Sequence, residues 1–396
     1  MNADTLPEER PMRVLVVDDL ELNRDLLLRR VQRLGHEADV AVDGRDALAK
    51  LAQRDWDLVL LDITMPQMDG YETLRHIRAD ARWARLPVVM VSAIDESDSV
   101  VRCLELGADD YLTKPFNPRV LQARVEASLA RKRLQDQQAR LLAALSREME
   151  MGQRIQQGFL PAALPALPGW SLAAFCRPAR RVGGDFYDAF ELPAGQCMLV
   201  VADVCDKGVG AALYMALFRS LLRITALQAP ASEPAPQTLR RSVTATNDYI
   251  AQVHGQENMF ATAFVAVLDP QGGVLSYLNA GHEPPLLRRA CGPGSAEALR
   301  ISGPALGLLA GQGWEVHRES LSAGDALLAF SDGLAEALDG PQAQPQHRLG
   351  LLLDAAQGRD AATVTAAIDQ ELAAHAAGEM PGDDITVLAL VRQPRG

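Results

Sequence analysis

The sequence predicts a multi-domain protein: a doubly wound α/β domain with a five-stranded parallel sheet, a long helical coiled-coil linker, and an α+β domain. Three observations lead to this prediction. Residues 13–130 alternate short apolar runs with amphipathic stretches, which is typical of β/α units. Residues 118–160 have helical periodicity and no proline between Pro118 and Pro161. Beyond Trp170, strand-like runs separated by Gly, Pro, Asp and Asn turns predominate.

The N-terminal region reads as five strands with helices between them. The expected strands cover residues 13–19, 37–42, 56–63, 87–93 and 110–114, and the expected helices cover 20–34, 43–55, 70–80 and 101–106. Such alternation implies a parallel sheet covered by helices on both faces.

Polar residues gather where four of these strands end. They are Asp18 and Asp19, Asp62, Ser92 and Lys114. In open α/β sheets the functional groups lie beyond the carboxyl ends of the strands. One aspartate there is usually a helix cap, but three carboxylates with a serine and a lysine fit Mg²⁺ binding and phosphoryl transfer to a carboxylate.

These residues stand in the motifs VVDD, DITMPQMDG, SA and YLTKPF. Residues 12–130 thereby resemble the receiver domains of two-component response regulators. The resemblance implies that Asp62 is the phosphoacceptor, phosphorylated by a sensor histidine kinase or a phosphotransfer protein. It also implies that Asp19, Asp62 and the Thr64 carbonyl hold Mg²⁺ and that Asp18 supports the metal's waters. Ser92 and Lys114 would contact the phosphoryl group, and Tyr111 would be the aromatic switch residue. The resemblance further implies a cis Lys114–Pro115 peptide bond.

The run 131–160 is expected to be the helical linker. Its apolar seam passes through Leu134, Leu141 and Leu145, then slips to Met149 shortly before Gly152. We expect a homodimeric coiled coil over 131–148 and a weaker segment, 149–160, that docks on the C-terminal domain and changes with the receiver's state. The alternative is one long helix packed on its neighbouring domains.

The C-terminal region is expected to be mainly strands with inserted helices. The expected strands cover 171–179, 186–192, 197–204, 262–269, 273–280, 325–332 and 385–391; the helices cover 208–227, 237–253 and 363–377; the tract 229–237 is expected to be a solvated loop. Aspartates stand at the ends of four of the strands, namely Asp185, Asp203, Asp332 and the pair Asp383 and Asp384. Each alone is typical of a turn, but together they fit two Mg²⁺ or Mn²⁺ ions.

The motifs ADVCDKGVGAALYMALFRSLLR, NAGHEPPLL, GPALGLL and DALLAFSDGLAEA resemble the SpoIIE-like branch of the metal-dependent Ser/Thr protein phosphatases, over residues 148–392. The resemblance implies an αββα sandwich over about 161–392 and hydrolysis of phosphoserine or phosphothreonine without a covalent intermediate. It implies two Mn²⁺ or Mg²⁺ ions, held by Asp203 as the bridge, the Val204 carbonyl, Asp332, Asp185, and either Asp383 or Asp384. Strand register favours Asp383. His282 is an alternative general acid, although a single His in this context is more often a packing residue.

The expected substrate is a phosphorylated anti-sigma-factor antagonist of the STAS type, by resemblance alone. One alternative is a non-catalytic adaptor that uses the phosphatase-like domain for partner binding, and another is a phosphatase acting on nucleotides or lipids. The net charge of −12 argues against nucleic-acid binding, and the linker's row of arginines is the only basic concentration that the sequence suggests.

The remaining composition favours a cytoplasmic protein. Five scattered cysteines without CxxC spacing are typical of reduced thiols. The N-terminus is acidic and lacks a secretory signal, and no run of apolar residues is expected to be long enough to span a membrane.

Overall fold

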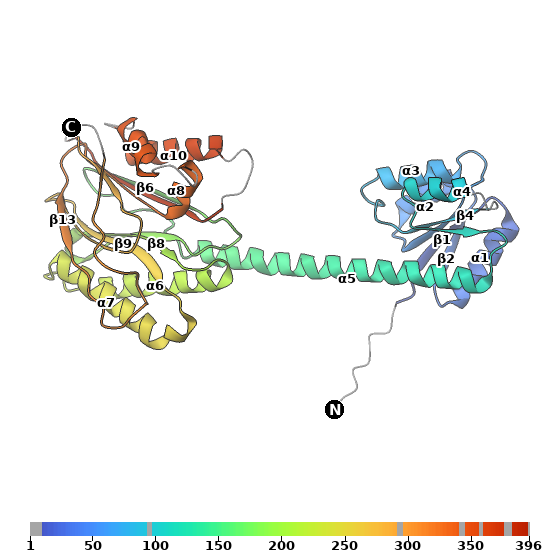
Figure 1. The fold of residues 1–396 in the computed structure, drawn as a ribbon, viewed down its shortest axis with the longest axis horizontal. Coiled ribbons are helices and arrows are strands. Elements are labelled where there is room, and N and C mark those ends of the chain that lie inside the picture. The colour runs from blue at the N-terminus through green and yellow to red at the C-terminus, as the bar shows by residue number, and fades with distance from the viewer. Residues whose placement is uncertain are drawn as a thin grey trace, which may run out of the picture. The chain divides into compact units, whose positions relative to one another are not determined.

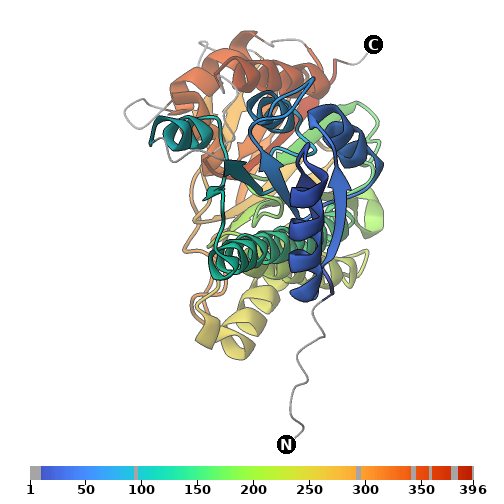
Figure 2. The same ribbon diagram turned by 90° about the vertical axis from the view of Figure 1, so that its right-hand side faces the viewer.

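The computed structural model describes residues 10–92, 97–290, 296–339, 345–355, 359–375 and 382–394. The chain divides into two compact units, Met1–Leu145 and Ser146–Gly396, which are considered separately below. Figures 1 and 2 show the elements of each unit.

The N-terminal unit contains a five-stranded parallel sheet in the order β2-β1-β3-β4-β5, which confirms the predicted doubly wound fold. Its elements are β1 Arg13–Val17, α1 Glu21–Arg33, β2 Glu37–Ala41, α2 Gly44–Gln53, β3 Leu58–Asp62, α3 Gly70–Ala79, β4 Val88–Ser92, α4 Ser97–Glu105 and β5 Asp110–Thr113. Strands β3 and β4 are fully buried because apolar clusters cover both faces of the sheet. The carboxylates of Asp43 and Asp69 cap α2 and α3.

Helix α5 is continuous over 40 residues, Pro118–Gln157. Its first turns bury Leu121, Val125 and Leu129 against the sheet of the N-terminal unit. Farther along, the seam residues Leu134 and Leu141 are 67% and 59% exposed. The predicted helix is therefore present, and its predicted seam is uncovered in the single chain.

The C-terminal unit holds two five-stranded sheets, ordered β13-β10-β9-β8-β7 and β12-β11-β14-β15-β6. The strands are β6 Trp170–Arg177, β7 Phe186–Glu191, β8 Cys197–Val204, β9 Ala261–Asp269, β10 Val274–Ala280, β11 Leu286–Arg288, β12 Glu297–Ala298, β13 His317–Ser320, β14 Ala326–Phe330 and β15 Ile385–Arg392. The helices are α6 Val209–Leu227, α7 Ala235–Val253, α8 Asp332–Asp339, α9 Pro345–Ala355 and α10 Ala361–His375, with 3₁₀ turns at Pro193–Gly195 and Gly255–Glu257.

Three apolar clusters assemble these elements into four layers. One cluster packs α6 and α7 on the sheet that contains β8, a second fills the space between the two sheets, and a third packs α8, α9 and α10 on the sheet that contains β14. Figure 1 shows α6 and α7 on one side of this unit and α8 to α10 on the other. The predicted αββα sandwich is confirmed.

Several sequence expectations for this unit are incomplete. Strands β11 to β13 and helices α8 and α9 were not anticipated, because they are short or follow a strand without a turn signal. Helix α7 begins at Ala235, so the tract 229–237 is only partly a loop. The sequence was expected to contain no apolar run long enough to span a membrane, but helix α6 is long and apolar enough by length and composition alone. Met215, Phe218 and Leu222 of that helix pack into the unit's core.

Candidate functional sites

The first candidate site lies at the carboxyl ends of the parallel strands in the N-terminal unit. Oxygen atoms of Asp18, Asp19 and Asp62 all lie within 4.8 Å of one another. Asp18 and Asp62 are buried, whereas Asp19 is exposed. Three carboxylates this close repel one another, and an all-oxygen set of ligands suits Mg²⁺.

Lys114 enters this site from the segment after β5. Its Nζ lies 2.7 Å from an Asp18 oxygen and 3.0 Å from an Asp62 oxygen. Burial raises the pKa of Asp62, and the hydrogen bond and charge of Lys114 oppose only part of that rise. Burial alone would lower the pKa of Lys114, but the two aspartates outweigh it and the pKa is raised. The lysine therefore stays charged and partly neutralises the cluster.

The loop after β3 closes tightly over Asp62. The Asp62 carboxylate accepts a hydrogen bond from the backbone of Ile63, and the backbone N–H of Gly70 bonds to the Ile63 carbonyl. A Cβ on Gly70 would lie 2.2 Å from the Asp62 carbonyl oxygen, so the glycine of the MDG motif is a packing requirement. Thr64, in the same loop, is exposed.

The other expected residues of this site lie on neighbouring strands. Ser92 ends β4, and its carbonyl accepts a hydrogen bond from the backbone of Lys114 at 2.6 Å. Tyr111 lies in β5 and packs partly buried against the apolar cluster. The Lys114–Pro115 peptide bond is cis, as expected.

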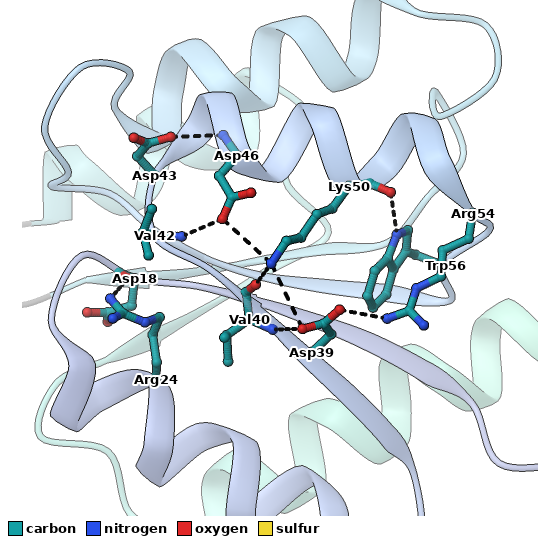
Figure 3. Close-up of polar contacts among 10 residues, drawn as sticks. All are labelled: Asp18, Arg24, Asp39, Val40, Val42, Asp43, Asp46, Lys50, Arg54 and Trp56. Carbon is teal, nitrogen blue, oxygen red and sulfur yellow. Dashed lines mark hydrogen bonds and ion pairs between the residues drawn. The ribbon is translucent and has the colours of Figure 1, made fainter.

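The sequence did not reveal two residues that hold the aspartate loop. Asn23 donates to the Asp18 carboxylate at 3.0 Å. Arg24 donates to the backbone carbonyls of Asp18 and Asp19, both at 2.7 Å, and Figure 3 shows its guanidinium beside Asp18. Their position in the first turn of α1, directly after the DD pair, is the signal that would have found them.

The second candidate site is built from both sheets of the C-terminal unit. Asp185 precedes β7 and Asp203 lies near the end of β8, while Asp332 begins α8 after β14 and Asp383 precedes β15. The first two come from one sheet and the last two from the other. The cluster is looser than the first, since no trio of these four has ligand atoms within 4.8 Å of one another.

Two adjacent glycines let Asp185 approach Asp203. A Cβ on Gly184 would lie 2.5 Å from the Val204 carbonyl oxygen, and a Cβ on Gly183 would lie 2.2 Å from the Asp384 carboxylate. The VGGD motif is therefore explained by close approach of the backbone to β8 and to Asp384. It places the Val204 carbonyl beside the Asp185 loop.

The carboxyl groups of Asp185, which is buried, and Asp203, which is partly buried, are joined by a hydrogen bond. Burial raises the pKa of Asp185, and the charge of Asp203 raises it further. Burial also raises the pKa of Asp203, to about 7; the hydrogen bond to Asp185 opposes this rise, and the charges of Asp332, Asp383 and Asp384 add to it. The Oδ2 atom of Asp185 is buried and has no hydrogen-bond partner within the described structure. An orphaned carboxylate oxygen, a repelling pair and an oxygen-only ligand set fit hard divalent cations, so the residues present suit Mg²⁺ or Mn²⁺.

The two adjacent aspartates before β15 have different surroundings. The Asp384 carboxylate accepts hydrogen bonds from the backbones of Ala179 and Gly184, both at 2.7 Å, which is a structural role. Asp383 instead pairs with Lys207 at 2.8 Å and faces Asp332, whose pKa is raised first by burial and then by Asp383. Lys207, in the DKG sequence, is a contact that the sequence reasoning missed.

His282 is buried and lies away from solvent. Its Nδ1 is 2.8 Å from the Thr262 hydroxyl, and Thr262 is the strand partner of Asp203. Burial lowers the pKa of His282 to about 4, so the ring is neutral and a poor general acid at neutral pH. The packing interpretation of this histidine fits the geometry better than the catalytic one. Its neighbour Glu283 is half-buried, and burial followed by the charge of Asp332 raises its pKa.

Helix α5 ends against the Asp185 loop. The side-chain amide of Gln156 donates to the Gly183 carbonyl at 2.5 Å and accepts from the Gly183 N–H at 3.1 Å. Gly183 is two residues before Asp185. The last turn of α5 is therefore tied by two hydrogen bonds to the segment that positions a carboxylate of the second site.

A receiver-type fold and an αββα sandwich with clustered aspartates define a phosphatase-fold protein with a receiver domain. The sequence profile described as Stage II sporulation protein E (SpoIIE) matches residues 193–393, and that described as Response regulator receiver domain matches residues 14–126. The chain belongs to the SpoIIE family and carries a receiver domain.

Relatives of known sequence match parts of the chain. Protein IcfG of Synechocystis sp. is 37% identical over 265 residues, which is 62% of this chain and 41% of that protein. The regulatory protein PhoP for alkaline phosphatase synthesis in Bacillus subtilis is 43% identical over 119 residues, or 30% of this chain and 49% of that protein. The chain spans 41% to 55% of the length of the curated relatives that it matches first.

Solved structures show the phosphatase fold. The RsbU and RsbW domains of Rv1364c from Mycobacterium tuberculosis are 30% identical, with a TM-score of 0.50, covering 60% of this chain and 64% of that one. The SiaA-PP2C domain of Pseudomonas aeruginosa has a TM-score of 0.54 at 18% identity, covering 64% of this chain and 99% of that one. The second likeness shows the fold alone.

Proposed function

We propose that this chain is a response regulator in which phosphorylation of Asp62 controls a metal-dependent protein phosphatase. The phosphatase would hydrolyse phosphoserine or phosphothreonine on a partner protein, such as a phosphorylated anti-sigma-factor antagonist of the STAS type. The observation that carries the proposal is the Asp185–Asp203 pair, in which a buried Asp185 oxygen has no partner among the described residues, because two ionised carboxylates this close repel each other unless a cation lies between them. The family's phosphatase domains are generally metal-dependent.

Each carboxylate of the second site has a role in this proposal. Asp203 would bridge two Mn²⁺ or Mg²⁺ ions with the Val204 carbonyl beside it, Asp332 and Asp383 would hold one ion, and Asp185 the other. When bound, the ions activate water and neutralise the phosphoryl oxygens. Asp384 holds the Asp185 loop through the backbone amides of Ala179 and Gly184. Lys207 balances the charge of Asp383.

The receiver site would be phosphorylated by a sensor histidine kinase or a phosphotransfer protein. Asp19, Asp62 and the Thr64 carbonyl would hold Mg²⁺, with Asp18 orienting its waters and keeping Lys114 in place at 2.7 Å. Ser92 and Lys114 would contact the phosphoryl group, and Tyr111 would repack in response. Helix α5, as a dimeric coiled coil over 131–148, would carry the change toward Gln156 and the Asp185 loop.

The test is hydrolysis of a serine-phosphorylated STAS-type protein by the full chain with Mn²⁺, with and without beryllofluoride. We expect hydrolysis whose rate changes on addition of beryllofluoride, and Asp62→Asn should remove that change while retaining the basal rate. Hydrolysis of nucleotides or lipids but not of the phosphoprotein would contradict the proposed substrate class. No hydrolysis of any phosphate ester would instead indicate a binding adaptor.

A further inference from the structure

The N-terminal unit has a cavity of about 450 Å³ that neither candidate site uses. It lies beside the segments that precede β1, β3 and β4, whereas the phosphorylation site lies where those strands end. The cavity therefore lies at the amino ends of the parallel strands, and the phosphorylation site lies at their carboxyl ends. A volume of this size is within the range of small-molecule sites.

The cavity lining is strongly basic in an acidic protein. Seven lining residues are Arg or Lys and three are Asp, although the chain as a whole carries 39 basic and 51 acidic residues. The basic side chains come from four segments: the start of β1, the end of α2, the loop before β4, and α5. The sequence expectation that the linker's arginine row is the only basic concentration is wrong, and Arg140 of that row lines this cavity.

Acidic side chains already neutralise part of this charge. Five of the seven basic lining residues have an acidic partner: Arg10 with Asp57 at 3.4 Å, Arg13 with Glu37 at 3.3 Å, Arg54 with Asp39 at 2.9 Å, Arg82 with Asp80 at 2.7 Å and Lys132 with Asp136 at 2.5 Å. Arg85 and Arg140, however, have no ion pair or hydrogen bond to any residue that the structure describes. Arg85 belongs to the loop before β4 and Arg140 belongs to α5. Two guanidinium groups without an acidic partner among the described residues therefore line the same cavity.

Two further arginines are held in place by indole rings. The guanidinium of Arg54 lies 4.2 Å from the Trp56 ring centroid, and that of Arg82 lies 4.5 Å from the Trp83 ring centroid. Figure 3 shows Arg54 paired with Asp39 while the Trp56 N–H donates to the Lys50 carbonyl. Stacking limits the freedom of both guanidinium groups, so less entropy is lost when they bind an anion.

We propose that this cavity binds a small molecule bearing a chain of phosphate groups, such as a nucleoside triphosphate. Planar guanidinium groups match phosphate oxygens in pairs, and two of them lack a partner here. The cavity is larger than one phosphate requires, which favours a polyphosphate chain. Because Arg140 belongs to α5, the bound anion would also join α5 to the loop before β4.

The experiment is calorimetric titration of the full chain, kept metal-free with EDTA, by ATP, by inorganic tripolyphosphate and by orthophosphate. We expect saturable binding of ATP or tripolyphosphate and weaker binding of orthophosphate. Tighter binding of ATP than of tripolyphosphate identifies a nucleotide, and equal binding identifies the phosphate chain as the recognised group. Binding should weaken as salt is added, because the attraction is electrostatic.

The variants Arg85→Gln and Arg140→Gln locate the site. We expect each to weaken binding by roughly tenfold, the effect of one charge-assisted hydrogen bond. Arg147→Gln is the matched control, since Arg147 lies seven residues beyond Arg140 on the same helix and does not line the cavity. Both test residues are exposed, so unfolding midpoints should stay unchanged. No saturable binding of any probe, or equal affinity in the double variant, overturns the proposal.

Discussion

The two carboxylate clusters of this chain achieve charge balance in different ways. In the receiver, Asp18 and Asp62 share one internal cation, Lys114, at 2.7 and 3.0 Å. In the phosphatase-fold unit, Lys207 neutralises Asp383, while the Asp185–Asp203 pair has a buried, unpartnered oxygen. The first cluster is compact, with Asp18 and Asp62 buried and Asp19 exposed. The second is spread over two sheets, and among its four aspartates only Asp185 is buried.

Under the proposed function, this difference suits two kinds of chemistry. A site that repeatedly gains and loses a phosphoryl group must be stable in both states, and an internal lysine supplies charge in each. A site that hydrolyses many substrate molecules can depend on resident cations, because they stay through each cycle. The comparison predicts that removing one carboxylate lowers the basal phosphatase rate only in the second unit.

The largest expected effect is that of Asp203→Asn on phosphatase activity. We expect the rate of p-nitrophenyl phosphate hydrolysis with Mn²⁺ to fall by more than roughly 100-fold, beyond the range seen for outer-shell residues. Asp62→Asn in the same assay should leave the basal rate within about twofold and abolish only the beryllofluoride response. Equal losses from both substitutions would break the proposed division of roles.

Gln156→Leu tests whether α5 acts on the second site. The substitution removes both hydrogen bonds to Gly183 without touching a carboxylate. We expect the hydrolysis rate to fall by roughly 10- to 100-fold and the Mn²⁺ concentration for half-maximal activity to rise, as for outer-shell partners of metal ligands. The control is Gln157→Leu, because Gln157 is exposed and makes no such bonds. If both variants have the same hydrolysis rate and Mn²⁺ requirement, the contact between Gln156 and Gly183 does not position Asp185.

Much of the fold could be predicted from the sequence because its signals are local. Apolar runs ending in aspartate located β1, β3 and β8, and helical periodicity located nearly all of α5. The first site was also predictable, because parallel strands bring their carboxyl ends to one edge. The contacts of Gln156 and Lys207 were not, since each joins residues at least 27 positions apart through side chains with no pattern of their own.

The basic cavity was missed for a similar reason. Arg10, Arg54, Arg85 and Arg140 are widely separated in the sequence and meet only when the strands, the loops and α5 assemble. Composition and residue spacing indicate only an acidic chain with one row of arginines. Local charge density depends on tertiary structure, which net charge does not describe.

The pH dependence of stability tests the Asp185–Asp203 pair of the second cluster. Burial raises the pKa of Asp203 and Asp185, so the folded metal-free state binds more protons than the unfolded state. The unfolding free energy should therefore fall as pH rises from about 4 through the raised pKa values, by about 1.4 kcal/mol for each pH unit that separates the folded from the unfolded pKa of one carboxyl group.

Urea unfolding of the C-terminal unit in EDTA measures this. Asp203→Asn relieves the repulsion, so its stability relative to the wild type should increase between about pH 4 and neutral pH. Saturating Mn²⁺ should reverse the wild-type trend, because a cation favours the ionised carboxylates. A stability difference that is constant with pH would show that the pair is not strained when the cation is removed.

The smallest expected effect is that of Gly152→Ala in the last turns of α5. A Cβ on Gly152 would lie 4.0 Å from the nearest Val182 methyl, so the residue fits without a clash, and alanine should stabilise the helix by about 1 kcal/mol. We expect the ratio of beryllofluoride-activated to basal phosphatase rate to change by a few-fold while the Mn²⁺ requirement stays constant. Gly313→Ala, in open space within a loop, is the control. If both rates match the wild type, α5 only spaces the two units, and the link from Asp62 to Asp185 must follow another route.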